Sequence, residues 1–371
     1  MNHSTSPFAN RALLVQKPKQ TQPMRFLVSL LFLLFLLQGA TAQVITRLSG
    51  GTSYFSYNVN DLATIVINAS ENDTIILPGG PINCTGITVN KPLTFIGAGV
   101  LNAGTAVTLP TVIPYAYNQD IVIASAGSGT RFHGINFDRV VRFTGGVSNV
   151  SFMRCAFAGF TLAGYQQVPP SNLNIKHCIF RSGIGNGSYT APQGLLVENS
   201  IIAGGINIGS IATAQITQCI ILNMTNNNGV NQGVVFSNNI FTRSSGSFSL
   251  NSASTYSNNL FAMNGGNTMN WNGAIDGGGN VGFQSTLTNV FFNLGSYTTY
   301  DESYDYHLVQ GSIGLTMGST GQVGIYGGPL GSPWKEGAIP FNPHWVSLQP
   351  SLGSTNGGTI NVTFSGAAQQ N

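Results

Sequence analysis

Charged side chains are scarce in this sequence. Of 371 residues only 14 are Lys or Arg and 11 are Asp or Glu, so 7% of the chain is charged, whereas an ordinary soluble domain carries about a quarter. Apolar residues make up 42% of the chain. This combination argues against disorder, because disordered chains are rich in charge and poor in apolar residues. The 47 glycines and the many asparagines favour short strands joined by tight turns.

One apolar run, from Phe26 to Leu37, lies between Arg25 and the small residues Ala40 and Ala42. This layout is typical of a secretory signal peptide that is cleaved before Gln43, and the run is too short to span a bilayer comfortably. We therefore expect residues 1–42 to be a signal peptide, with Met24 as an alternative start. The mature protein is expected to be secreted, extracellular or on the outer cell surface. A retained membrane anchor is the alternative.

Removal of this peptide changes the charge balance. Four basic residues, Arg11, Lys17, Lys19 and Arg25, lie within 1–42, which leaves 10 basic and 11 acidic residues in the rest of the chain. An excess of positive charge is the electrostatic sign of a nucleic-acid partner, and the mature chain lacks it. We expect no nucleic-acid partner and no stable membrane span, and the pattern indicates no particular oligomeric state.

A six-residue motif recurs seven times at steps of 19 to 23 residues, which is typical of a stacked repeat. The copies are FHGINF (132–137), FMRCAF (152–157), IKHCIF (175–180), VENSII (197–202), ITQCII (216–221), FSNNIF (236–241) and YSNNLF (256–261). The first and sixth positions are apolar in every copy. The third position holds Gly134, Arg154, His177, Asn199, Gln218, Asn238 and Asn258. Gly and Asn best tolerate left-handed backbone geometry, so this column predicts a tight bend between two strands.

Each copy is too short to bury a core of its own, so the copies must stack. We predict an all-β fold, a right-handed parallel β-helix (a solenoid) with a short N-terminal helical cap and an irregular C-terminal closing segment. Residues 43–100 are the cap and first rungs, with a helix at 61–70, and residues 101–265 are the central rungs, with a lateral loop at 101–120. Residues 266–350 are the closing segment and 351–371 a C-terminal strand or tail. A single domain is expected from about residue 50 to 345.

Cys178 follows His177 directly, which invites a catalytic interpretation. Cys178 also belongs to the fourth column of the repeat, with Cys155 and Cys219, just after the bend. We expect it to be buried and structural, because a nucleophilic thiolate needs exposure and a nearby cation. A disulfide between Cys155 and Cys178 stays open, since adjacent rungs lie within the permitted Cα range.

The two ends of the repeat carry a family resemblance. Residues 87–99 (ITVNKPLTFIGAG) resemble the N-terminal part of pectate-lyase-like right-handed β-helix proteins. Residues 304–315 (YDYHLVQGSIGL), 323–328 (VGIYGG) and 333–345 (PWKEGAIPFNPHW) resemble the closing segment of secreted bacterial β-helix repeat proteins. The resemblance covers roughly residues 43–350. It implies that Asp305 and His307 belong to a strand and turn that end the coil, and that acidic polysaccharides are the ligand class.

The repeats provide little for catalysis. Asp138 and Glu198 are the only acidic residues within 131–261 and lie about three rungs apart, whereas glycoside hydrolysis needs a facing pair of carboxyl groups. Calcium-assisted lyase chemistry needs several carboxylate ligands, which the rungs lack. We expect no metal and no cofactor, and Ca²⁺ only if the protein is a lyase.

Basic residues gather in the stretch 131–181, where Asp138 is the one acidic residue. The candidate binding residues are Arg131, His133, Arg154, Lys176, His177 and Arg181. Three of them, Arg131, His133 and Lys176, share an outward parity, which predicts a basic stripe that binds an anionic glycan. A solvated strand face with scattered charges is the alternative.

These observations favour a secreted or cell-surface β-helix protein that is non-catalytic and has a scaffold, adhesive or glycan-binding role. One alternative is a polysaccharide lyase or hydrolase that acts on acidic uronate glycans. Another is a flat solenoid that binds ice or mineral, although the repeats contain no Thr column.

Overall fold

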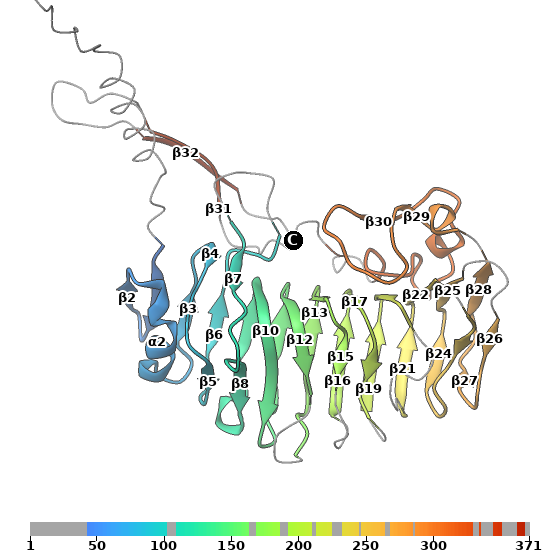
Figure 1. Cartoon of the computed structure of the whole chain (residues 1–371), viewed down its shortest axis with the longest axis horizontal. Coiled ribbons are helices and arrows are strands. Elements are labelled where there is room, and N and C mark those ends of the chain that lie inside the picture. Colours follow the sequence, from blue (N-terminus) through green and yellow to red (C-terminus); the bar gives the residue numbers. More distant parts are fainter. Residues whose placement is uncertain are drawn as a thin grey trace, which may run out of the picture. The chain divides into compact units, whose positions relative to one another are not determined.

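The computed structural model describes residues 43–101, 109–162, 168–185, 192–209, 213–224, 232–244, 246–263, 268–284, 286–328, 334, 344–350 and 362–367. Residues 43–371 form one compact unit. Its strands form a parallel β-solenoid of about nine turns, with one short helix near the N-terminus (Figure 1). The predicted right-handed parallel β-helix is therefore confirmed. The predicted signal peptide lies outside the described residues.

Sheet A forms one face of the coil and has 12 strands among the described residues. The sheet is parallel except at its N-terminal edge, where β2, β1 and β3 pair antiparallel. In spatial order its strands are β2 (Thr52–Ser56), β1 (Ile45–Ser49), β3 (Thr74–Ile76), β6 (Thr94–Ile96), β9 (Arg131–His133), β11 (Ser151–Met153), β13 (Asn174–Lys176), β16 (Gln193–Glu198), β19 (Thr213–Thr217), β21 (Val234–Ser237), β24 (Thr255–Ser257) and β27 (Ile275–Asp276).

Sheet B follows sheet A in each turn and has 14 strands in the same part of the chain. Its main path is β4 (Gly80–Pro81), β7 (Thr111–Ile113), β10 (Ile135–Thr144), β12 (Ala156–Thr161), β14 (Ile179–Phe180), β17 (Ile201–Ala203), β20 (Ile220–Leu222), β22 (Ile240–Arg243), β25 (Leu260–Met263) and β28 (Val281–Gln284). Beside it lie β5 (Ile87–Val89), β8 (Ile121–Ala124), β15 (Ile184–Gly185) and β18 (Ile206–Asn207). The β7 strand corrects the expectation of a loop throughout 101–120, because residues 111–113 form part of a rung.

The remaining elements are short. Three two-stranded sheets pair β23 (Phe248–Ser249) with β26 (Met269–Asn270), β29 (Phe291–Asn293) with β30 (Asp305–Leu308), and β31 (His344–Pro350) with β32 (Val362–Ala367). Within the described ranges the α-helix is α2 (Leu62–Asn68), and the 3-10 helices are η1 (Val59–Asp61), η2 (Ser125–Gly127), η3 (Leu287–Asn289) and η4 (Ile313–Leu315). The α2 helix buries Leu62 and Val66 in the main core, as the predicted cap requires.

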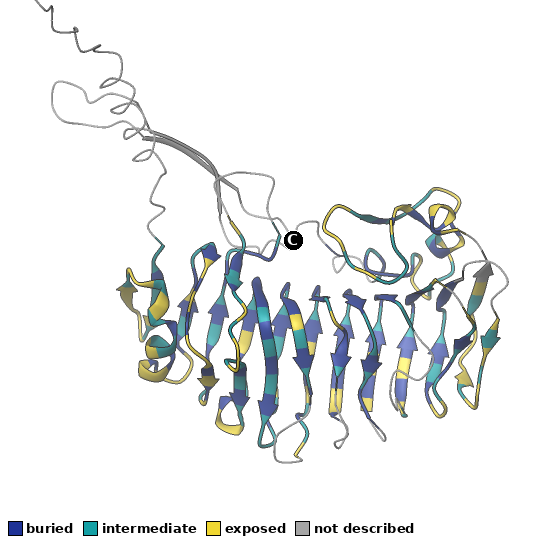
Figure 2. Ribbon diagram, viewed as in Figure 1, coloured by how far each residue is buried: buried dark blue, intermediate teal, exposed yellow. Residues whose placement is uncertain are grey.

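The columns of the repeat stack in register, as predicted. Phe152 pairs with Phe132 on one side and with Ile175 on the other. The Phe132 and Phe152 rings stack with centroids 4.9 Å apart, which matches the spacing of neighbouring strands. Both rings are almost fully buried, and buried residues recur from turn to turn along the coil (Figure 2). The first and sixth columns therefore form a continuous core.

The third column is the predicted bend. Its six non-glycine residues have φ between 44° and 57°, and Gly134 has φ 65°. Asn is common at this conformation, but Arg154, His177 and Gln218 adopt it at a steric cost. Each bend leads the chain from sheet A into sheet B, and the stacked core offsets the cost at the turns where the bend residue is neither Gly nor Asn.

Towards the C-terminal end of the coil, the fourth column holds asparagines whose side chains form a ladder of hydrogen bonds. The Asn259 side chain accepts a hydrogen bond from the Asn239 backbone N–H at 3.0 Å and donates to the Phe236 carbonyl at 2.9 Å. Asn239 and Asn280 make the corresponding bonds at the neighbouring turns. These side chains satisfy the backbone groups that the bend would otherwise leave buried and unpaired.

A second apolar cluster lies on the outside of sheet B. We call its sheet residues the outer stripe; they are the fifth-column residues Ala156, Ile179, Ile201, Ile220, Ile240 and Leu260, each at most 1% exposed. The stripe is buried because the chain turns back after β28 and packs on it. We call residues 286–328 together with Trp334 the covering segment. Its Val290, Phe291 and Val323 are fully buried in this second cluster.

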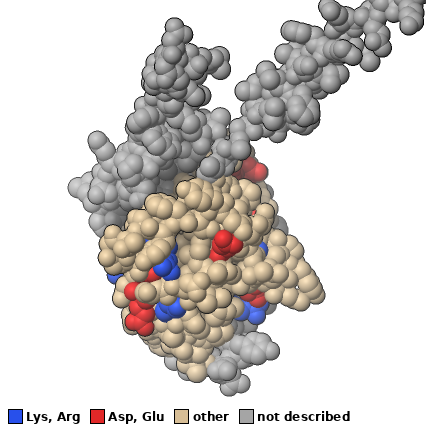
Figure 3. Space-filling model, turned by 90° about the vertical axis from the view of Figure 1, so that its left-hand side faces the viewer, with Lys and Arg blue, Asp and Glu red and all other residues tan. Residues whose placement is uncertain are grey.

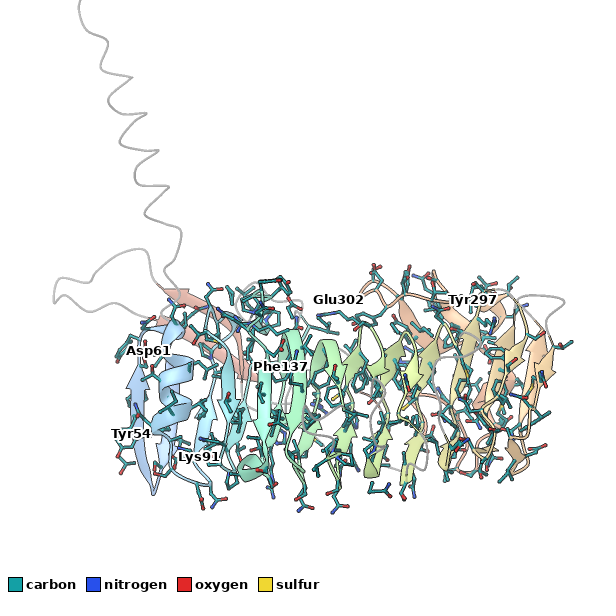
Figure 4. All side chains as sticks on the ribbon, turned by 60° about the horizontal axis from the view of Figure 1, so that its bottom comes forward. Tyr54, Asp61, Lys91, Phe137, Tyr297 and Glu302 are labelled. Carbon is teal, nitrogen blue, oxygen red and sulfur yellow. The ribbon has the colours of Figure 1, made fainter. Side chains whose placement is uncertain are left out.

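The covering segment corrects the expectation for Asp305 and His307. They do form a strand, β30, which pairs antiparallel with β29. The pair does not end the coil but lies over the outer face of sheet B (Figure 1). Tyr297 lies near the C-terminal turns, whereas Glu302 lies over the central ones (Figure 4). The segment therefore runs back along the coil.

Candidate functional site

The bend column anchors the covering segment. The Asn199 amide donates to the carbonyls of Ile325 and Gly327 at 2.8 and 3.0 Å. The Asn238 side chain accepts from the Ser319 backbone N–H at 2.8 Å. The Thr242 hydroxyl, on β22, donates to the Tyr297 carbonyl at 2.6 Å. These bonds hold the segment near both of its ends. The residues that border the space between the segment and sheet B are therefore held in place.

That space consists of two adjoining cavities, which we call the groove. The first, of about 420 Å³, is lined by Leu101, Ile201, Tyr300, Glu302, Ser303, Tyr304, Asp305, Tyr306, Tyr326 and Trp334. The second, of about 490 Å³, is lined by Arg181, Thr298, Thr299, Tyr300, Asp301 and Glu302. Tyr300 and Glu302 belong to both. Each cavity has the size of a small-molecule site, and the lining combines aromatic rings with carboxylates.

A compact turn positions the aromatic rings. The Asp301 carboxylate accepts from the Ser303 backbone N–H at 2.8 Å and from its hydroxyl at 2.6 Å. These bonds lower the pKa of Asp301. The Tyr300 and Tyr306 rings stack with centroids 5.8 Å apart. Burial raises the pKa of both phenols far above the usual value, so both hydroxyls stay protonated at neutral pH.

A second group of contacts fixes the part of the groove lining around Asp305. The Asp305 carboxylate lies 2.7 Å from the His307 ring Nδ1 and accepts from the His307 backbone N–H at 2.9 Å. Partial burial opposes ionisation of Asp305, but the hydrogen bonds from His307 outweigh it and lower the pKa of the carboxyl. The His307 ring stacks on Tyr326 with centroids 3.8 Å apart. Asp305 is therefore a fixed, ionised acceptor in the groove wall.

Arg181 joins the coil to the covering segment. Its Nη1 donates to the Asn136 side-chain oxygen and to Asp138, both at 2.9 Å. Its Nη2 lies 3.9 Å from the Glu302 carboxylate, which is 55% exposed. Two carboxylates from residues far apart in sequence thus meet at one guanidinium. Asp138 and Glu198, the pair considered from the sequence, lie on different sheets, and Glu198 instead binds Lys176 at 2.7 Å.

The six predicted binding residues separate into three places. Arg131, His133 and Lys176 lie on the outer face of sheet A, with Met153 between His133 and Lys176 in register. Lys176 is paired with Glu198, and burial, together with nearby Arg131, lowers the pKa of His133. The basic stripe is therefore partly neutralised. Charged side chains seen from the N-terminal end of the coil form small separate groups (Figure 3).

The other three predicted residues lie elsewhere. Arg154 is 3% exposed in the bend column, and burial lowers its pKa to about 10. His177 is 9% exposed and its ring lies parallel to Trp334, with centroids 6.2 Å apart. Arg181 lines the groove. Only His177 and Arg181 of the predicted residues thus adjoin the groove.

The cysteines are structural. All four are buried and free, so Cys155 and Cys178 are separate thiols on adjacent turns. The Cys178 sulfur accepts from the Cys155 backbone N–H at 3.4 Å, and burial raises the pKa of the Cys178 thiol. A thiol in this setting is a poor nucleophile.

A lyase calcium site needs several oxygen ligands, and no group of three or more His, Cys, Asp or Glu side chains in the described residues is placed to hold a metal ion. The described side chains therefore do not fit the calcium that the lyase alternative implies. In the same part of the chain no helix has the length and apolarity needed to cross a membrane.

The residues from Tyr300 to Tyr306 were not predicted from the sequence to line a site. One signal was present: the fifth column is apolar from Ala156 to Leu260, although alternation assigns it to the outside. An apolar column on both faces of a strand indicates that another element covers it.

Comparison with known proteins finds no relative: no family model, no curated protein and no solved structure matches this chain. The pectate-lyase-like relationship stays a prediction from the sequence.

Proposed function

We propose that this protein is a secreted, non-catalytic β-helix that binds glycans in the groove. The observation that supports this most strongly is the lining of the groove, where Tyr304, Tyr326 and Trp334 lie beside Glu302 and Asp305. A sugar ring presents an apolar C–H face, which packs on aromatic rings, and a rim of hydroxyls, which bond to carboxylates. A few convergent polar groups in an aromatic site are what orient a small ligand.

The charge of the groove favours uncharged glycans. Three carboxylates, Asp301, Glu302 and Asp305, line the groove, and a fourth, Asp138, pairs with Arg181, the one Lys or Arg side chain in the described lining. A polyuronate chain would bring further negative charge into this field and would be repelled. Neutral sugars meet no such cost. An acidic polysaccharide, which the family resemblance implies, is better matched by the basic stripe on sheet A, where Arg131 is exposed.

A polysaccharide hydrolase of the same superfamily is the second candidate. One observation favours it: Asp138 and Glu302 both lie within ion-pair distance of Arg181, and glycoside hydrolysis uses two carboxyl groups that flank the bond. Release of reducing sugar from neutral polysaccharides by the wild-type protein, abolished in both Asp138→Asn and Glu302→Gln, would establish this activity. Binding without release supports the non-catalytic role.

Binding is tested by affinity electrophoresis in neutral and in acidic polysaccharides. We expect retardation in at least one neutral gel, with Tyr304→Ala and Glu302→Gln each weakening it about tenfold. Tyr57→Ala is the matched control, because it removes a tyrosine that is 79% exposed at the other end of the coil. Equal retardation of all variants, or retardation in polygalacturonate alone, would contradict a neutral-glycan site in the groove.

A further inference from the structure

A loop next to the groove presents two tyrosines to solvent. Residues 114–119 lie in the connection from β7 to β8, and we call them the tyrosine loop. Tyr115 is 73% exposed and Tyr117 is 78% exposed. Rings so exposed contribute little to folding, since almost none of their surface is removed from water.

A buried arginine fixes the loop. Arg139 is 3% exposed, and its guanidinium donates to the carbonyl oxygens of Pro114 at 2.6 Å and Gln119 at 3.3 Å, at the two ends of the loop. It also donates to the carbonyls of Cys84 at 2.6 Å and Thr85 at 3.3 Å. A buried charge is tolerated only when its donors are bonded. Movement of the loop would remove these partners, so the loop is held in one conformation.

A fixed loop makes its tyrosines effective contact groups. A rigid backbone with aromatic side chains loses little conformational entropy when a ligand binds. The loop is also electrically balanced, because the adjacent Asp120 pairs with Arg142. Its polar neighbours Asn118 and Gln119 are uncharged. This surface, like the groove, suits a ligand with apolar faces and neutral hydrogen-bonding groups.

The loop and the groove lie along the same corner of the coil. Ile113, Phe137, Phe157 and Phe180 are in register on successive strands. The residues that follow them, Pro114, Asp138, Ala158 and Arg181, therefore lie near one another on successive turns, although the register of β10 and β12 shifts after Phe137. Pro114 begins the tyrosine loop and Arg181 lines the groove. Three strand spacings separate them, or about 14 Å along the axis. Asp138, between them, is bonded to Arg181.

We infer that the tyrosine loop is a second subsite of the groove, and that the ligand is an extended, uncharged polysaccharide lying along this corner. The inference rests on the proposed function. Sugar rings stack on Tyr115 and Tyr117 at one end of the chain and on the groove aromatics at the other. A monosaccharide or disaccharide reaches only one of the two sites. Affinity therefore rises with chain length, because the second contact is made within one bound chain.

The test compares short and long oligosaccharides by calorimetry. Cello-, xylo-, manno- and laminari-oligosaccharides are titrated as dimers and as hexamers into the wild-type protein, Tyr115→Ala/Tyr117→Ala, Tyr304→Ala and the control Tyr57→Ala. We expect the loop variant to bind the preferred hexamer at least about tenfold more weakly and to bind the dimer as the wild type does. Tyr304→Ala weakens both lengths. Tyr115→Phe/Tyr117→Phe, which keeps the rings, restores hexamer binding.

The outcomes separate the two proposals. If Tyr304→Ala loses binding and the loop variant binds every length normally, the groove stands and the subsite is overturned. If the wild-type protein binds none of the sugars, both proposals fail. If the tyrosines instead mediate contact between proteins, light scattering will show a wild-type oligomer that the loop variant lacks, and hexamer affinity will not depend on the loop.

Discussion

Asn259 shows how one side chain can join three turns of the coil. It accepts from the Asn239 N–H and donates to the Phe236 carbonyl and to Asn280, and it is fully buried. We expect Asn259→Ala to lower the free energy of unfolding by about 2–4 kcal/mol, because two buried backbone groups lose their partners. Urea unfolding measures this. The control Asn60→Ala changes an exposed residue. If both variants lose a similarly small amount of unfolding free energy, the hydrogen bonds of Asn259 do not stabilise the coil.

Phe152 tests the core at the same scale. Its ring is 1% exposed, stacks on Phe132 and meets the edge of Phe157 at a centroid distance of 5.2 Å. Phe152→Ala is expected to cost about 3–5 kcal/mol, since a cavity opens in a close-packed column. Phe236→Ala should cost about as much. A loss below about 1 kcal/mol in urea unfolding would place these rings outside the core.

Buried phenols and thiols predict a loss of stability in alkali. Burial raises the pKa of Cys219 from 9.0 to about 12 and that of Tyr256 from 10.0 to about 12. The unfolded chain loses these protons first, so the folded state binds more protons and its stability falls as pH rises from about 9 to 12. Unfolding midpoints measured across this range should fall steadily. A flat profile would mean that these groups ionise equally easily in both states.

At the scale of the element, the bend column has two roles. It turns the chain, and through Asn199 it also binds the covering segment. Asn199→Gly keeps the left-handed backbone and removes only the amide, so we expect faster hydrogen exchange at Gly327 and Trp334 with the coil unchanged. Asn258→Gly is the control, because the Asn258 side chain makes no hydrogen bond to the described residues of the covering segment. Equal exchange in both variants would contradict the docking role.

Whether a feature could be predicted from the sequence depended on how far apart along the chain its residues lie and on whether the repeat connects them. The bend at Gly134, Asn199 and Asn258 and the Phe core could be predicted, because each is set by a local pattern that repeats every turn. The meeting of Arg181 with Glu302 could not be predicted, because the two lie 121 residues apart and no period connects them. The outward Ile201 and Ile220 indicated a cover, but not which residues provide it.

At the scale of the whole molecule, the coil has two unlike outer faces. Sheet A presents polar and charged side chains such as Arg131, His133 and Lys176. Sheet B presents the apolar outer stripe and needs the covering segment to keep it from water. The groove lies between this segment and sheet B, where Arg181 lines it. Stability and the candidate site therefore depend on the same segment.

The last prediction tests that dependence. A chain ending at Gln284 keeps the stacked turns but exposes Ile201, Ile220 and Ile240, which are now at most 1% exposed. A contiguous apolar face of this kind drives association, so we expect light scattering to show oligomers of the shortened chain, in contrast to the full chain. Substituting Thr at these three positions, which suits a solvent-facing strand, should return the shortened chain to the oligomeric state of the full chain. If the shortened chain with its native isoleucines already has the oligomeric state of the full chain, the segment is not needed to shield sheet B.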